Sequence, residues 1–115
     1  MIDIQQLLMS SASLTSIVQT RIANGLMPED FSRPFLVWTI ISEIAEESLS
    51  CIPETDSFLV QFDSYSKDAK QSRRIIETAR AQIETLTSSI TVRQFYESDT
   101  AMFRWSMDAS FVSDR

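Results

Sequence analysis

The chain has 115 residues, 43% of them hydrophobic, which is enough for one compact domain over residues 1–115 with a single core. Its only cysteine, Cys51, rules out an intrachain disulfide, and the absence of histidine removes the common zinc and iron ligand sets, so a metal or redox enzyme is not expected. The formal net charge of −6 disfavours tight binding of nucleic acid, and with no bilayer-length apolar run and no secretory signal we expect a soluble protein made in the cytoplasm.

The first third of the chain predicts two short helices and an exposed connection. Asp3 is a suitable N-cap for a helix through about residue 11, because apolar residues follow it at helical spacing. The sequence SSAS at 10–13 interrupts this helix, and the apolar residues in 14–18 predict one or two further turns. Residues 24–34 contain an Asn-Gly pair, proline and two adjacent acids, which are typical of an exposed loop.

The middle of the chain predicts two strands separated by a polar segment. Residues 35–44, FLVWTIISEI, are rich in β-branched and aromatic residues, and residues 57–63 alternate apolar and polar side chains. The segment between them is polar and contains Pro53, which indicates a long hairpin or an excursion from the edge of the sheet.

Five acidic residues with no base among them lie in and beside this polar segment: Glu43, Glu46, Glu47, Glu54 and Asp56. All of the excess negative charge belongs to the first half of the chain, because residues 57–115 contain eight acids and eight bases. Such a surface repels phosphate, and its simplest interpretation is a solvated acidic loop.

Residues 66–86 predict an amphipathic helix with Ser66 as its N-cap and Asp68 in its first turn. Helical spacing places seven small or apolar residues in one sector, which is predicted to pack against the sheet: Ala69, Ser72, Ile75, Ile76, Ala79, Ile83 and Leu86. The opposite sector carries five bases: Lys67, Lys70, Arg73, Arg74 and Arg80. Because Glu77 and Glu84 stand four residues after two of these bases, we interpret this sector as a solvated face rather than a nucleic-acid patch.

Two strands complete the predicted sheet. The Thr-Ser-Ser segment at 87–89 predicts a break in regular structure, and residues 90–97, ITVRQFYE, predict a strand after it. ESDT at 97–100 predicts a turn. Residues 101–112 alternate regularly, so we expect them to form a hairpin with 90–97 and to bury Trp105. The order of elements predicts an α+β fold, with a mainly antiparallel sheet of about four strands and two principal helices packed on one face.

No arrangement of residues indicates catalysis or a cofactor site. The only glycine, Gly25, excludes a phosphate-binding glycine loop, and without histidine neither Cys51 nor a serine has its usual base. The adjacent carboxylates Glu46 and Glu47 have no neighbour that would shift their pKa. Five aromatic residues are able to stack bases: Trp38, Phe95, Tyr96, Phe103 and Trp105. Because Phe103 and Trp105 share the alternating apolar face of one strand, we interpret this set as core instead. We expect no enzymatic activity, no cofactor and no metal.

Four segments, taken in order, carry a resemblance to a known family. They are LTSIVQTRI at 14–22, PFLVW at 34–38, VQFDSYSKDAKQSRRI at 60–75 and FRWSMDASF at 103–111. They resemble segments of the tail-completion or tail-terminator (head-tail joining) proteins of long-tailed bacteriophages and prophages. The first is like that family's leucine, apolar pair and Arg-Ile, and the second like its Pro-aromatic-apolar strand opening. The third is like its strand-to-helix unit, and the fourth like its closing strand, with an aromatic-Arg start and an internal Asp.

The resemblance implies a structural virion protein of the tail-neck region, assembled in the host cytoplasm. Such proteins form a ring, generally six-fold, that caps the tail tube, ends its elongation and presents a surface to the head-tail connector. The implied partners are further copies of the chain, the major tail-tube protein and the connector, with DNA passing through the lumen without specific binding and no membrane.

Within that resemblance, the five acids become a candidate assembly or lumen loop, in which neighbouring copies would repel one another. Two alternatives remain open. One is a head-side neck adaptor of similar size, and the other, from a different class, is a small α+β ligand-binding or regulatory domain.

Overall fold

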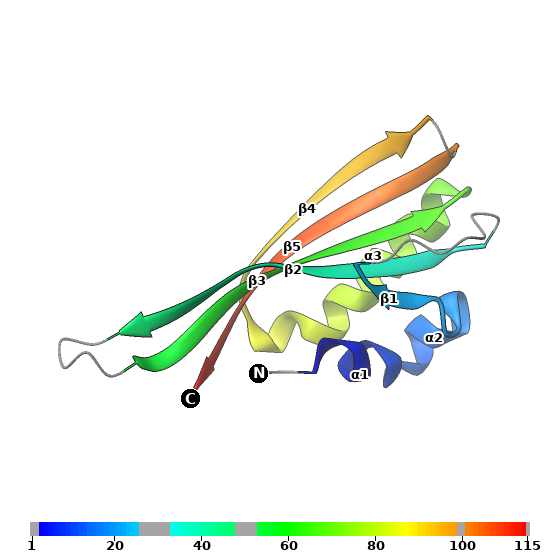
Figure 1. Cartoon of the computed structure of the whole chain (residues 1–115). Helices are drawn as coiled ribbons and strands as arrows, with labels where there is room; N and C mark the ends of the chain where they lie inside the picture. The colour runs from blue at the N-terminus through cyan, green and yellow to red at the C-terminus, as the bar shows by residue number, and fades with distance from the viewer. Residues whose placement is uncertain (1–2, 26–32, 48–52, 99–100, 115) are drawn as a thin grey trace.

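The computed structural model describes residues 3–25, 33–47, 53–98 and 101–114 (Figure 1). Five strands form one sheet in the order β1-β2-β3-β5-β4. Their bounds are β1 Ile22–Asn24, β2 Phe35–Glu47, β3 Pro53–Ser66, β4 Thr87–Glu97 and β5 Met102–Asp114. The helices are α1 Ile4–Met9, α2 Ala12–Val18, α3 Ala69–Ile83 and a short 3₁₀ helix, η1, at Glu84–Leu86. None of the helices in these ranges is long and apolar enough to cross a membrane.

The first helix begins where the sequence predicts, and the second begins at Ala12, inside the predicted break. The backbone NH of Gln6 donates to the Asp3 carboxylate at 3.0 Å, which makes Asp3 the N-cap of α1. Ser10 ends α1, and the Ser11 hydroxyl accepts the Leu14 NH at 3.2 Å as the N-cap of α2. The predicted helix, break and second helix are therefore confirmed.

The α+β prediction is confirmed, but the sheet has five strands and is mixed. Three of its pairings are antiparallel, and β1 pairs with β2 in parallel, from Ile22 opposite Leu36 to Asn24 opposite Trp38. The three residues of β1 are too few to show alternation, so periodicity gave no sign of this strand. Gly25 follows it with φ 71°, a left-handed conformation that glycine adopts freely. Most of the predicted loop at 24–34 lies outside the described residues.

The prediction of a polar loop between the two central strands is wrong at both ends. Residues 45–47 continue β2 and residues 53–56 begin β3, with Ala45 opposite Asp56 and Glu46 opposite Thr55. Pairing with neighbouring strands satisfies the backbone whatever the side chains are, so polar residues extend these strands. The long hairpin is confirmed. Residues 48–52, which include Cys51, lie outside the described part of the chain.

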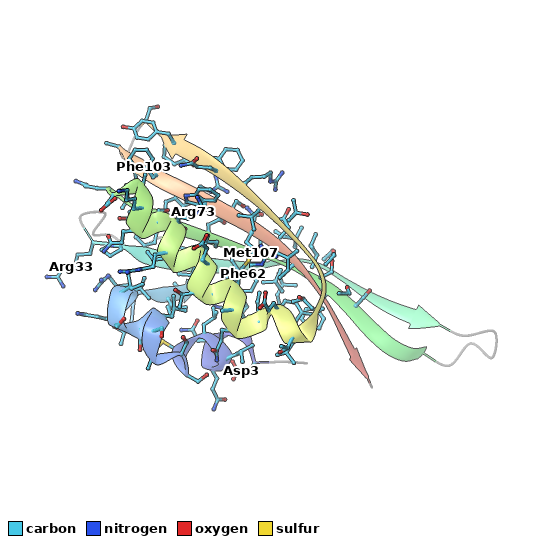
Figure 2. The ribbon with its side chains drawn as sticks, turned by 180° about the vertical axis from the view of Figure 1, so that it is seen from behind. Asp3, Arg33, Phe62, Arg73, Phe103 and Met107 are labelled. Carbon is cyan, nitrogen blue, oxygen red and sulfur yellow. The ribbon has the colours of Figure 1, made fainter. Side chains whose placement is uncertain are left out.

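The core lies between α3 and the middle of the sheet. The buried helix positions are those predicted, except that Ala69 is only partly buried and Leu86 is 42% exposed. Leu86 falls in η1, where the path of the chain has left the α-helical spacing. Figure 2 shows α1, α2 and α3 in front of the sheet, and Phe62 of β3 and Met107 of β5 belong to the apolar cluster that α3 covers.

Two serines bring α3 close to the strands. The Ser72 hydroxyl donates to the backbone carbonyl of Phe103 at 3.0 Å, and the Ser64 hydroxyl donates to the carbonyl of Ser72 at 2.8 Å. Both serines are fully buried, so these bonds satisfy polar groups that would otherwise destabilise the core. The predicted cap, Ser66, is wrong by two residues. Asp68 caps α3 by accepting the Lys70 NH at 3.0 Å, because β3 continues to Ser66.

The final hairpin is confirmed, with one change of boundary. β4 pairs antiparallel with β5, but it begins at Thr87, inside the segment predicted as a break, and a bulge lies between Thr87 and Ser89. On β5, Met107, Ala109 and Phe111 are fully buried, as the alternation predicts.

The sheet is much longer than the helix that packs against it. β2 and β3 have 13 and 14 residues, about 43–46 Å at strand spacing, whereas the 15 residues of α3 span about 22 Å. The excess length projects as a hairpin from one end of the molecule, whose long axis is 52 Å (Figure 1). We call residues 43–47 and 53–56 the acidic arm, because they contain all five acids of the candidate segment and no base.

Candidate assembly surfaces

The sheet face opposite the main core carries a cross-strand polar network centred on Arg104 of β5. Its Nε donates to Asp63 of β3 at 2.9 Å, and its Nη1 donates to Glu97 of β4 at 3.0 Å. The guanidinium carbon lies 5.9 Å from the centre of the Tyr65 ring and 5.2 Å from that of Phe95. One side chain therefore connects three neighbouring strands.

These partners stabilise the charged form of Arg104. Burial acts to lower the pKa of the guanidinium, but hydrogen bonds and charge from Asp63, with support from Glu97, outweigh it and raise the pKa above its ordinary value. Burial also raises the pKa of the Tyr65 phenol, although Arg104 opposes the change. Both pKa shifts are upward, so Arg104 keeps its positive charge and Tyr65 stays neutral at pH 7.

A second set of contacts extends this network along the sheet. Arg93 of β4 donates to Asp108 of β5 at 2.8 Å, and Gln61 of β3 donates to Ser106 of β5 at 3.1 Å. Together the two networks set three carboxylates against two guanidinium groups. Arg93 and Arg104 are each paired with carboxylates on this face, so neither guanidinium group is free to bind phosphate.

The sequence alone indicates which residues of this network are polar strand positions, but not which of them meet. Asp63 and Arg104 both stand at polar positions of alternating strands, but the sequence does not say which residues face each other. The register places Asp63 opposite Ser106 and Phe95 opposite Arg104. Only this register brings the Arg104 side chain between two acids from different strands.

One edge of the sheet is β4, and it carries exposed aromatic residues. Phe95 is 43% exposed and Tyr96 is 57% exposed, so the prediction that these aromatics belong to the core is wrong for both. It is right for Trp38, which is 8% exposed. An edge strand has neighbours on one side only, which leaves its side chains and half of its backbone groups uncovered.

The predicted burial of Trp105 is only partly confirmed. Its ring packs against the core as a half-buried side chain, Arg73 lies over it at 5.5 Å, and its indole NH is enclosed without a hydrogen-bond partner. The ring lies in a hollow between α3 and β4, lined also by Ile76 and Val92. α3 does not reach far enough across the sheet to close this side.

The polar sector of α3 is exposed throughout, as predicted. The Arg73–Glu77 and Arg80–Glu84 pairs form at 2.8 and 3.6 Å. All four side chains are at least half exposed, so each pair contributes little to stability.

The structure places the predicted acidic residues on two strands of one arm. Glu43, Glu46 and Glu47 belong to β2, and Glu54 and Asp56 to β3. In the pairing of these strands Ala45 lies opposite Asp56 and Glu46 opposite Thr55. Among the described residues no group of three or more potential metal ligands occurs.

These features define an α+β protein with a sheet braced across three strands, an exposed edge strand and a projecting hairpin (Figure 1). The sequence profile of the family described as Tail completion protein gp17 matches residues 2–114, and the chain belongs to this family. Membership makes it a structural, tail-associated protein of the phage virion.

A solved structure shares the fold. One chain of the "Virion of native gene transfer agent (GTA) particle" superposes with a TM-score of 0.67 at 11% sequence identity, covering 97% of this chain and 92% of that chain. At this identity the likeness concerns the fold. No curated protein sequence matches the chain.

Proposed function

We propose that the chain is a single tail-terminator domain that forms a ring on the last ring of the tail tube. The ring, six-fold as in the proteins it resembles, ends tube elongation and presents the head-tail joining surface in the neck of the virion. Its partners are the major tail-tube protein and the head-tail connector, and its role is structural rather than enzymatic. The family match over residues 2–114 carries this proposal.

The shape of the protein is consistent with a ring subunit. Its acidic arm and its β4 edge are different surfaces on one elongated molecule, and contacts between unlike surfaces generate closed rings when the rotation closes. The polar network ties β3, β5 and β4 together, so the sheet is suited to act as a rigid wall. We assign the acidic arm to assembly or to the lumen, as the charge pattern suggests.

The assignment is tested on growing tubes. When the purified protein is added to tail-tube subunits that are polymerising, we expect tubes to stop lengthening and to carry a cap at one end in electron micrographs. A cap stops growth because it covers the surface to which the next ring would bind. Tubes that lengthen at the same rate with and without the protein would contradict the proposal, and binding to tailless heads alone would indicate a head-side neck adaptor.

We also expect the protein to have no appreciable affinity for duplex DNA at physiological salt. Phosphate contacts supply most non-specific affinity, and here the net charge is −6, with Arg93 and Arg104 already paired to carboxylates. Fluorescence anisotropy with a labelled duplex measures this directly. Submicromolar binding that weakens steeply with salt would show that the protein grips DNA instead of letting it pass.

A further inference from the structure

The outer side of β4 is an open sheet edge. Among the described residues β4 pairs with β5 alone, over the eleven residues from Thr87 to Glu97. An edge strand leaves NH and carbonyl groups that another strand can bind, and natural edges are often short or interrupted by proline, lysine or bulges. β4 contains no proline and no lysine, and its register is regular from Ser89 to Glu97. At the opposite edge β1 has only three residues, and the Gln5 side chain already donates to the Ile22 carbonyl at 2.8 Å.

The open edge carries aromatic surface on both faces of the sheet. On the face opposite α3, the ring centre of Phe95 lies 5.2 Å from the guanidinium carbon of Arg104. On the other face, the ring centre of Tyr96 lies 5.1 Å from that of Phe103. Phe95 and Tyr96 both remain exposed despite these contacts. A strand added to β4 therefore buries aromatic surface on both faces at once.

The charges of β4 are complementary to those of a second copy. Arg93, Phe95 and Glu97 occupy every second position of the strand, so they share one face. In an antiparallel pair of β4 strands with Phe95 opposite its own counterpart, Arg93 of each copy stands opposite Glu97 of the other. Opposite charges that face each other directly stabilise strand pairing. Centring the pair on Arg93 or on Glu97 instead puts like charges together, so the charges favour the register centred on Phe95.

Both charged side chains are already oriented by their own copy. Arg93 donates to Asp108 at 2.8 Å, and Glu97 accepts from Arg104 at 3.0 Å. Pairing with a second copy continues these contacts as a line of alternating charges that crosses from one sheet to the other. Because the network orients the side chains beforehand, less conformational entropy is lost on binding.

We propose that free copies of the protein form a dimer through their β4 strands, antiparallel about a two-fold axis at Phe95. The two sheets then form one continuous sheet, and each copy covers the open edge and the aromatic rings of the other. Such a contact uses the same surface on both copies, so it closes at two and leaves no β4 edge for further copies. The dimer thus protects this edge from aggregation before the protein reaches the tail.

The dimer is a different state from the ring proposed above. Neighbours in a ring of six are related by its six-fold rotation, whereas the copies of this dimer are related by a two-fold rotation. The β4 contact therefore cannot join neighbours of the ring, and the dimer must open before the ring forms. Only this last consequence rests on the proposed function, because the dimer itself follows from β4.

A pair of charge reversals tests the register. One variant carries Arg93→Glu and the other Glu97→Arg, so each alone places like charges opposite each other and is expected to dimerise less than the wild type. In an equimolar mixture the mixed dimer again has opposite charges at both positions, and we expect it to be about tenfold tighter than either variant's own dimer, with less gain at high salt. Sedimentation equilibrium measures the dissociation constants, and circular dichroism verifies folding. Arg80→Glu is the matched control, because it reverses an arginine of similar exposure on α3 and should leave dimerisation at the wild-type level.

A cysteine variant tests the same register without reversing a charge, and it decides the matter if a reversed variant fails to fold. In a Cys51→Ser background, Phe95→Cys places two thiols at the two-fold axis, where directly opposite Cβ atoms lie about 4.5–5.5 Å apart, close to their separation in a disulfide. Thr91→Cys, on the same face of β4, places the two thiols about 27 Å apart. After mild oxidation, non-reducing electrophoresis should show a cross-linked dimer for Phe95→Cys and none for Thr91→Cys.

Two results would overturn the dimer. One is a mixture of folded charge-reversed variants that associates no better than its components. The other is cross-linking of Phe95→Cys that does not exceed that of Thr91→Cys. The tube assay separates either failure from that of the proposed function, because wild-type protein that stops tube growth keeps the terminator role whatever happens at β4. Conversely, a dimer that passes both tests stands even if tubes continue to lengthen.

Discussion

Replacing Phe62 by alanine is expected to lower the free energy of unfolding by about 3–5 kcal/mol. Phe62 is fully buried on the central strand β3, opposite Trp38 on one side and Met107 on the other. Removing its ring leaves a cavity between α3 and the sheet that well-packed neighbours cannot fill. Domains of this size are stable by only about 5–15 kcal/mol, so urea denaturation followed by circular dichroism should show the transition moved far toward zero denaturant.

Leu86→Ala is the matched control for this loss. Leu86 is apolar and large as well, but it is 42% exposed in η1, and its replacement should change the free energy of unfolding by no more than about 0.5 kcal/mol. Equal losses at the two positions would mean that the core does not lie where α3 meets β3.

Arg104→Ala is expected to cost about 2–3 kcal/mol of unfolding free energy, because it leaves the Asp63 carboxylate without its cation. The side chain of Asp63 is only 10% exposed, so water cannot fully replace the lost partner. The cost is smaller than for a fully buried pair because the Arg104 side chain is 24% exposed. Urea denaturation at several salt concentrations measures both the loss and its small dependence on screening.

Arg93→Ala provides the comparison, since it also removes an arginine that pairs across β4 and β5. The Arg93 side chain is 54% exposed, so its contact with Asp108 should contribute between about 0 and 1 kcal/mol. If the two variants lose the same stability, the Arg104 network does not brace the sheet as inferred.

Local patterns determined much of the fold. The cap at Asp3 and the buried stripe of α3 were predictable because each depends on residues a few positions apart. The same holds for the inward face of β5, where alternation alone selects Met107 and Phe111. The order of such segments along the chain was also enough to suggest the family. The family match over residues 2–114 confirms it.

Features that depend on pairing between distant segments were decided by the tertiary structure alone. β1 exists because β2 offers it a partner, and residues 45–47 and 53–56 are strands because neighbouring backbones accept their hydrogen bonds despite polar side chains. The Arg104 network likewise needs the register that joins β3, β5 and β4. Exposure of Phe95 follows from the position of β4 at the edge, a matter of strand order. Sequence periodicity reports which residues share a face, whereas register and strand order determine which residues that face meets.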